Sequence, residues 1–201
     1  MIVGIYLAAG HSERMGCHKL SLSLGNKPLG SVALETAILS VLDRTIVVTR
    51  EEDSLNWLPS ELFLDPYRKK WKHQRCKESV RGQAESLKCG LKAAKDMQAK
   101  AVMVLLADQP FVTKKIINHI VFLYKTEKPS HISSCYKGVL RPPVLFDSTV
   151  FPALFQLHGD EGARRILRND ITGITVEFNT EKPFLDADTP DQFKVLIEQL
   201  E

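Results

Sequence analysis

The sequence predicts an α/β fold with a mostly parallel sheet and helices on both of its faces. Two observations support this class. Short apolar segments typical of buried strands alternate along the chain with longer segments that have helical periodicity. The first segment, residues 2–8, is apolar almost throughout, as expected for a parallel strand that helices cover on both sides. No linker, repeat or low-complexity tract divides the 201 residues, so we expect one domain spanning residues 1–201.

Each predicted element has its own signal in the sequence. Apolar residues at helical spacing predict helices, and apolar or β-branched runs predict strands. Thr113 is a favoured N-cap residue, and Thr189 forms a capping box with Gln192 around Pro190 at the first helical position. The predicted helices are residues 30–42, 83–98, 113–127, 161–169 and the segment that begins at 190, with Asp160 as the N-cap of the helix at 161–169. The predicted strands are residues 2–8, 20–24, 45–49, 101–106, 131–136, 143–146, 174–178 and 183–185.

Composition and charge exclude several classes of protein. No apolar run approaches the roughly 20 residues that a membrane span needs, and the start lacks the basic region of a signal peptide. We therefore expect a cytoplasmic protein with no membrane partner. The formal net charge of +3 is too small to indicate nucleic-acid binding, but it suits a small polyphosphate substrate. The most basic segment, residues 68–77, is either a solvated face or a contact surface for an anionic partner.

The four cysteines indicate no metal site. They stand at positions 17, 76, 89 and 135, and no pair has the CxxC spacing of a zinc site. In a cytoplasmic protein of this size we expect them to be reduced thiols.

A glycine-bracketed loop follows the first strand. Gly10 and Gly16 allow positive φ and close approach of a ligand, and backbone N–H groups in such a turn attract anions. Arg14 can donate paired hydrogen bonds to phosphate oxygens, and Lys19 adds a point charge. The spacing is neither GxGxxG nor GxxxxGK[ST], so it is neither a dinucleotide fingerprint nor a P-loop. The loop predicts a site for a nucleoside triphosphate; the alternative is an ordinary turn with surface cations.

Three aspartates are candidate metal ligands. Asp108 follows the strongest strand signal, and ligand sites in open α/β sheets lie at the carboxyl ends of strands. A carboxylate there can hold Mg²⁺, which bridges phosphate oxygens. Asp186 and Asp188 alternate along an extended segment, so both can face one site, and we favour Asp186 as the second ligand. The alternative roles are a turn residue at Asp108 and a helix start at Asp188.

Other segments are candidates for substrate contacts. Gly82 begins a helix whose backbone donors, with Ser86, could hold a nucleoside or phosphate, although a plain helix entry explains them equally well. The rigid segment 141–146 could form the wall of a pocket. Arg164 and Arg165 either contact an anionic acceptor or are solvated.

The chain resembles a known family at several of these motifs. The segments Leu7-Ala8-Ala9-Gly10-x-Ser12-x-Arg14-Met15-Gly16-x-x-Lys19, Leu106-x-Asp108-Gln109-Pro110 and Asp186-x-Asp188-Thr189-Pro190 are similar to those of the nucleotidyltransferases related to molybdenum cofactor enzymes. Within that group, Ala8-Ala9-Gly10 and Asp108-Gln109-Pro110 are similar to the cytidylyltransferases. Two departures stand out: Ala107 replaces the usual glycine before Asp108, and Arg141-Pro142-Pro143 replaces a Gly-His-Pro.

The resemblance implies a Rossmann-like three-layer α/β/α fold, with a mostly parallel mixed sheet of the nucleotidyltransferase type. It also implies Mg²⁺-dependent transfer of CMP from CTP to molybdopterin, whose product serves hydroxylases of the xanthine dehydrogenase type. The alternatives are a GTP-dependent molybdopterin guanylyltransferase, a sugar- or alditol-phosphate nucleotidyltransferase, and a carrier that docks on a molybdoenzyme without chemistry.

The motifs and the resemblance together predict one site. Nucleotide binding is expected at Leu7, Ala8, Ala9, Gly10, Arg14, Lys19, Gly82 and Ser86. Catalysis is expected at Arg14, Lys19 and Asp108, and Mg²⁺ binding at Asp108, Asp186 and Asp188.

Overall fold

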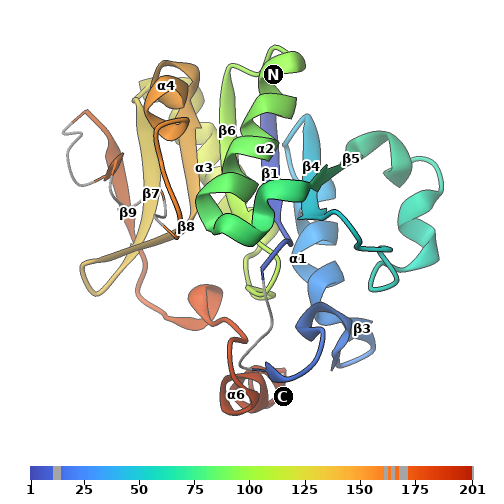
Figure 1. Cartoon of the computed structure of the whole chain (residues 1–201). Coiled ribbons are helices and arrows are strands. Elements are labelled where there is room, and N and C mark those ends of the chain that lie inside the picture. Colours follow the sequence, from blue (N-terminus) through green and yellow to red (C-terminus); the bar gives the residue numbers. More distant parts are fainter. Residues whose placement is uncertain (11–14, 161–162, 164–165, 168–171, 201) are drawn as a thin grey trace.

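A computed structural model of the chain contains one mixed sheet flanked by helices (Figure 1). It describes residues 1–10, 15–160, 163, 166–167 and 172–200. Among these residues, seven strands form the main sheet in the order β5-β4-β1-β6-β8-β7-β9. The strands are β1 (Ile2–Leu7), β4 (Arg44–Arg50), β5 (Trp71–Cys76), β6 (Ala101–Leu106), β7 (His131–Tyr136), β8 (Val139–Asp147) and β9 (Ile174–Glu177). Only β8 runs against its neighbours in the described sheet, which confirms the mostly parallel mixed sheet.

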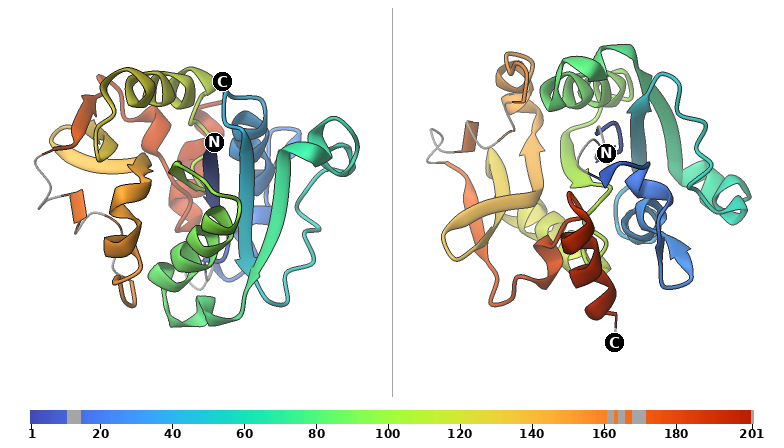
Figure 2. Two further views of the ribbon diagram at one scale, coloured as in Figure 1. Left: turned by 90° about the horizontal axis from the view of Figure 1, so that it is seen from above. Right: turned by 60° about the horizontal axis from the view of Figure 1, so that its bottom comes forward.

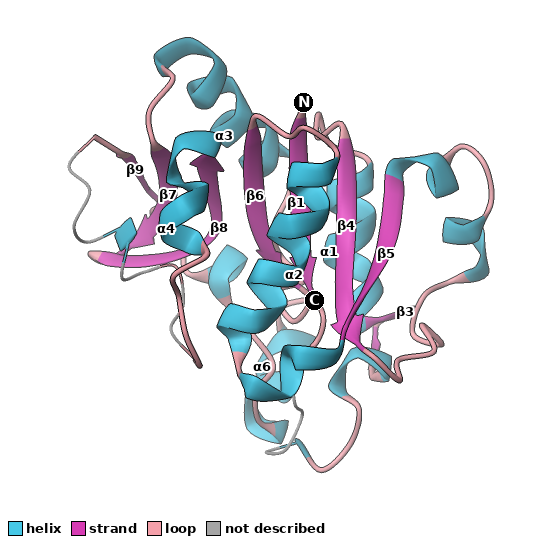
Figure 3. Ribbon diagram, turned by 45° about the horizontal axis from the view of Figure 1, so that its top comes forward, coloured by secondary structure: helices cyan, strands magenta, loops and turns pink. Residues whose placement is uncertain are grey.

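Helices cover both faces of the sheet (Figure 3). The helices α2 (Gln83–Asp96) and α4 (Phe151–Leu154) pack on one face, and α1 (Leu29–Ile38) and α3 (Lys114–Glu127) pack on the other. Alternate residues of β1 serve the two faces: Val3 and Ile5 belong to the core under α2, whereas Tyr6 belongs to the core over α1 and α3. This alternation explains why the whole strand is apolar, since neither face meets water.

Most of the predicted elements are present with small shifts at their ends. Thr113 caps α3 as predicted, because its hydroxyl oxygen accepts a hydrogen bond from the Ile116 N–H at 3.3 Å. Thr189 also caps α6 (Pro190–Glu198) as predicted, because its Oγ1 accepts from the Gln192 N–H. The other half of the capping box differs, since the Gln192 side chain accepts from the Asp188 N–H and not from that of Thr189. The predicted helix 161–169 lies mainly outside the described residues, within which Ile166 and Leu167 are helical.

Three predictions of local structure were wrong. Residues 20–24 are not one strand: Leu20 and Ser21 end a short 3-10 turn (Lys19–Ser21), and only the two-residue strand β2 (Ser23–Leu24) pairs with β3 (Lys27–Pro28). Residues 183–185 fall in and just after a 3-10 turn (Lys182–Phe184), where Pro183 has no N–H for a sheet. The edge strand β5 was missed, because its apolar residues are confined to its two ends, Trp71 and Cys76.

The expectation that all cysteines are reduced was also wrong. Cys76 and Cys89 form a disulfide, whereas Cys17 is exposed and Cys135 is buried as free thiols. The separation of 13 residues between the two cysteines did not predict a disulfide. The pair meets only because the end of β5 lies beside the second turn of α2.

One edge of the sheet collects the carboxyl ends of the parallel strands. In Figure 1 this edge is at the bottom, with α6 below it, and the right view of Figure 2, in which the bottom comes forward, shows this red C-terminal helix in front. Segments 7–10, 106–109 and 186–188, which are far apart in sequence, therefore meet there. Within the described part of the chain, no helix has the length and apolar character required to cross a membrane.

Candidate active site

A cavity of about 740 Å³ opens at the carboxyl ends of β1 and β6. It brings together the described site residues that the sequence predicted: Leu7, Ala8, Ala9, Gly10, Lys19, Gly82, Ser86, Asp108, Asp186 and Asp188. It also includes residues that were not predicted as site residues: Leu20, Ser79, Val80, Arg81, Gln83, Leu106, Ala107 and Asp160. Arg14 lies outside the described residues, as do Arg164 and Arg165.

The loop after β1 is held by the sheet where the chain leaves it. The Ala8 N–H donates to the Val48 carbonyl at 2.8 Å, and the Ala107 N–H donates to the Leu7 carbonyl at 3.1 Å. Gly16 has φ +66°, as expected for the loop, but Gly10 does not have a positive φ. A Cβ on Gly10 would meet no atom within 4 Å. Because glycine has no side chain, the space beside Gly10 in the cavity is open, which suits close approach of a ligand.

Lys19 is the buried cation of the cavity. Its Nζ donates to Asp108 Oδ2 at 2.5 Å and to Asp188 Oδ1 at 2.9 Å, and the whole residue is 8% exposed. Burial alone lowers the pKa of Lys19, but the charges and hydrogen bonds of Asp108 and Asp188 outweigh it, so the pKa is raised. Lys19 is therefore charged at neutral pH, and it partly balances two carboxylates that face the same space.

Asp186 and Asp188 are fixed by the residue between them. Ala187 is fully buried in a small cluster with Leu196 of α6, so the two aspartates on either side turn toward the cavity. Gln192 holds both: its Oε1 accepts from the Asp188 N–H at 3.0 Å and its Nε2 donates to Asp186 Oδ1 at 3.2 Å. Burial, and then the charges of Asp108 and Asp188, raise the pKa of Asp186.

The three aspartates form a suitable but incomplete metal site. Their oxygens do not all lie within 4.8 Å of one another, so they are not a preformed set of three ligands. Mg²⁺, however, usually takes only one or two carboxylates and completes its shell with water and substrate phosphates. The crowding of negative charge that raises the Asp186 pKa is also what a divalent cation would relieve. The donor set therefore fits Mg²⁺ bound together with a phosphorylated substrate.

The start of α2 is arranged differently from the prediction. The N–H groups of Gln83 and Ala84 already donate to Asp160 Oδ1 at 3.4 Å and to the Gly159 carbonyl at 2.9 Å. These backbone donors are thus used within the protein, while Ser86 and Arg81 are among the residues that line the cavity here. Gly82 makes this approach possible, because it has φ +119° and a Cβ would lie 2.4 Å from the Gly159 backbone.

A second cavity of about 380 Å³ adjoins the first. The two share Leu7, Gln83, Leu106 and Asp160. Its outer wall includes Arg141 and Pro142, as the sequence suggested for the segment 141–146. Arg141 Nε is buried without a hydrogen-bond partner among the described residues, although its Nη2 lies 3.9 Å from Glu181 Oε1. A ligand in this cavity would meet an arginine with an unused donor.

The basic segment 68–77 does not reach either cavity. It comprises most of a 3-10 turn (Tyr67–Lys70), the strand β5 and Lys77, and none of its residues is among those that line the two cavities in the described structure. The cations of this segment therefore do not contribute directly to the site.

Comparison with known proteins identifies the family. A family model described as a MobA-like NTP transferase domain matches residues 4–174. The chain belongs to this family. It is accordingly a nucleotidyltransferase, and the cavity at the carboxyl ends of β1 and β6 is its candidate active site.

Relatives cover nearly the whole chain. The purine catabolism protein PucB of Bacillus subtilis (strain 168) is 36% identical over 198 residues, which are 97% of this chain and 95% of that protein. The crystal structure of Rv0371c from Mycobacterium tuberculosis H37Rv has a TM-score of 0.78 at 24% identity, covering 98% of this chain and 97% of that one. Its complex with manganese has a TM-score of 0.69 at 20% identity, covering 98% of both chains. The molybdopterin-guanine dinucleotide biosynthesis protein A of Archaeoglobus fulgidus has a TM-score of 0.72 at 17% identity, covering 100% and 98%. These structures share the fold.

Proposed function

We propose that the protein transfers CMP from CTP to molybdopterin and releases pyrophosphate. The observation that carries this proposal is the meeting of Lys19, Asp108 and Asp188 in the cavity beside the glycine loop. A buried cation suits the phosphate groups of a substrate, and the carboxylates on either side of it suit the divalent metal ion that such a substrate brings. The MobA-like family and the PucB relative support a molybdopterin-type acceptor and a role in purine catabolism. We further propose that residues 1–201 act as one domain in the cytoplasm.

The chemistry requires positioning and charge neutralisation rather than a covalent enzyme intermediate. The terminal phosphate of the acceptor attacks the α-phosphorus of CTP, the new P–O bond forms, and the bond to pyrophosphate breaks. The backbone from Leu7 to Gly10 holds the nucleotide, while Lys19 and Arg14 neutralise the phosphates and the leaving pyrophosphate. Asp108 and Asp186 or Asp188 would hold Mg²⁺, which as a bound cation supplies further neutralisation of the phosphate charge.

The adjoining cavity is the proposed acceptor site. It is lined mainly by apolar side chains, and its polar residues are Gln83, Arg141 and Asp160, so it suits a flat heterocycle whose anionic group lies at Arg141. It shares residues with the nucleotide cavity, which brings an acceptor next to the nucleotide. The choice of CTP rests on the resemblance of Ala8-Ala9-Gly10 and Asp108-Gln109-Pro110 to the cytidylyltransferases. A molybdoenzyme of the xanthine dehydrogenase type is the proposed recipient of the product.

A thermal-shift panel with the four nucleoside triphosphates and Mg²⁺ tests the nucleotide assignment. CTP is expected to raise the melting temperature most, because a ligand that binds only the folded state stabilises it. A larger shift with GTP would indicate the guanylyltransferase alternative. Turnover with a sugar or alditol phosphate, but not with molybdopterin, would indicate the third enzyme alternative. Binding of molybdopterin with no turnover of any nucleotide would indicate a carrier.

A further inference from the structure

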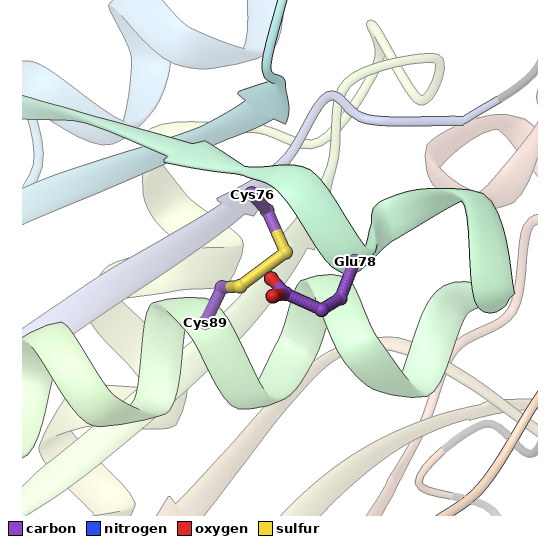
Figure 4. A group of neighbouring side chains, drawn as sticks. All are labelled: Cys76, Glu78 and Cys89. Atoms are coloured by element: carbon purple, nitrogen blue, oxygen red, sulfur yellow. A yellow bond between two sulfur atoms is a disulfide. The ribbon is translucent and has the colours of Figure 1, made fainter.

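The disulfide between Cys76 and Cys89 joins two elements beside the nucleotide cavity (Figure 4). Cys76 is the last residue of the edge strand β5, and Cys89 lies in the second turn of α2, with their Cα atoms 6.0 Å apart. Glu78 lies beside the bond, with a carboxylate oxygen within 4.8 Å of both sulfurs. Neither cysteine is used by the proposed reaction.

The segment that this disulfide closes is one wall of the cavity. Between the two cysteines the chain forms a 3-10 turn (Lys77–Arg81) and the first turns of α2. Six residues of this segment line the cavity: Ser79, Val80, Arg81, Gly82, Gln83 and Ser86. The strand β5 is an edge strand that pairs only with β4 in the described sheet. The disulfide therefore fixes both ends of the cavity wall to each other.

We propose that Cys76 and Cys89 are a reversible redox site that controls nucleotide binding, an inference that rests on the function proposed above. Oxidation by a low-molecular-weight disulfide converts the two thiols to the Cys76–Cys89 bond and yields two small thiols. Reduction by a dithiol reverses this: two electrons and two protons pass to the protein sulfurs, and the dithiol becomes a cyclic disulfide. The oxidised form has a preorganised cavity wall and binds the nucleotide more tightly. In the reducing cytoplasm, such bonds are mostly transient and regulatory.

The surroundings of the two sulfurs determine how the bond is opened. Cys76 is 1% exposed, whereas Cys89 is only half-buried, so an incoming thiolate reaches the Cys89 sulfur first and expels the Cys76 thiolate. The Glu78 carboxylate disfavours a thiolate beside it and slows this step. Glu78 is exposed and does not line the cavity. Glu78→Gln is therefore expected to speed reduction several-fold and to leave the CTP affinity of the oxidised protein unchanged.

Calorimetric titration of CTP with Mg²⁺ into the fully oxidised and the fully reduced protein tests the proposal. We expect the dissociation constant to rise about fivefold on reduction, since the wall of the cavity loses its covalent constraint. Cys89→Ser should bind CTP like the reduced protein and should not respond to oxidant or reductant. Cys135→Ala, which removes a buried free thiol on β7, should respond like the unmodified protein.

Several results would overturn the proposal. Equal affinities in the two redox states would do so, as would alkylation of both cysteines after exposure to a disulfide oxidant. One tightly held Zn²⁺ in the reduced protein, with thiols that resist oxidation, would show a Cys76–Glu78–Cys89 metal site instead. If no nucleotide binds in either state, the proposed function fails. Amide hydrogen exchange of residues 77–88 then decides: faster exchange on reduction supports the redox site, and equal exchange contradicts it.

Discussion

Among single residues, Lys19 and the carboxylates around it matter most for the proposed function. The sequence predicted Lys19 from the glycine loop, Asp108 from its place after a predicted strand, and Asp186 and Asp188 from their alternation along an extended segment. All four line one cavity. It could not predict that Lys19 would bridge Asp108 and Asp188, because that contact joins segments 89 and 169 residues away from Lys19. The sequence also could not predict that the first N–H groups of α2 would donate to Gly159 and Asp160, since these hydrogen bonds depend on a tertiary contact.

Lys19→Ala is expected to lower kcat/KM for pyrophosphate release by about 10²-fold, because the phosphates lose a buried positive charge. A coupled pyrophosphate assay measures this. Lys27→Ala is the matched control, since Lys27 also pairs with a carboxylate, that of Glu35, but does not line the cavity. Comparable losses in the two variants would mean that Lys19 is not part of the phosphate site.

Gly82→Ala is expected to destabilise the fold by about 3 kcal/mol, because it adds a clash with Gly159 to the strain of a backbone conformation that only glycine adopts readily. Gly138→Ala separates the two effects. Gly138 also has a positive φ, +74°, but a Cβ there would meet nothing within 4 Å, so we expect a loss of only about 1 kcal/mol. Denaturant unfolding measures both, and equal losses would argue against close packing at Gly82.

At the scale of elements, periodicity and capping residues predicted most of the helices and strands. Thr113 and Thr189 marked helix starts correctly because a cap acts through neighbours two or three residues away. The strand β5 was missed because its pattern is dominated by cations that an edge strand can expose. The turn at Lys182–Phe184 was mistaken for a strand because its apolar residues are buried by tertiary packing.

The helix α6 positions the Asp186–Asp188 segment through Gln192. Gln192→Ala is expected to raise the KM for Mg²⁺ about tenfold, because both aspartates lose a hydrogen bond that orients them. The melting temperature should change little, since Thr189 still caps the helix. Lys194→Ala, on the same helix but paired only with the exposed Asp191 in the described structure, is the control. An unchanged KM for Mg²⁺ in Gln192→Ala would contradict this role.

A hydrogen bond between α3 and β8 makes stability depend on pH. Tyr124 Oη donates to Asp147 Oδ2 at 2.5 Å. Burial alone would raise the pKa of Asp147, but this bond and those from Thr149 and Ser148 lower it overall. The folded state thus favours the carboxylate, so the stabilisation is complete above the unfolded pKa of about 3.9 and is lost as the pH falls through the lower folded value.

Tyr124→Phe is therefore expected to cost about 1 kcal/mol at pH 7, given the partial exposure of the pair. The cost should shrink as the pH falls below about 4 toward the lower folded pKa of Asp147, because the stabilisation by the carboxylate is lost over that range. Urea unfolding at a series of pH values measures it. Tyr67→Phe, at an exposed position, should cost little at any pH. A Tyr124→Phe penalty that stays constant down to pH 2 would exclude the charge of Asp147 as its source.

At the scale of the whole molecule, the parallel sheet explains why distant motifs meet. The strands β1 and β6 are neighbours and run in the same direction, so the segments that follow them share one edge. The sequence predicted this edge as the site from the alternation of strands and helices, together with the glycine loop, the aspartate motifs and the family resemblance. It indicated a pocket wall at segment 141–146, but it could not predict that this cavity would adjoin the first one, nor the disulfide, since both arise where β8, β5 and α2 pack beside that edge.

Pyrophosphate release from CTP with Mg²⁺ and molybdopterin, measured for the protein and for Asp108→Asn, tests the proposed reaction and its metal site together. We expect release by the unmodified protein and a loss of about 10²-fold or more in the variant, because one carboxylate of the proposed metal site becomes neutral. Near-normal release by Asp108→Asn would show that Asp108 is not a metal ligand, and no release by the unmodified protein with both substrates present would overturn the proposed function.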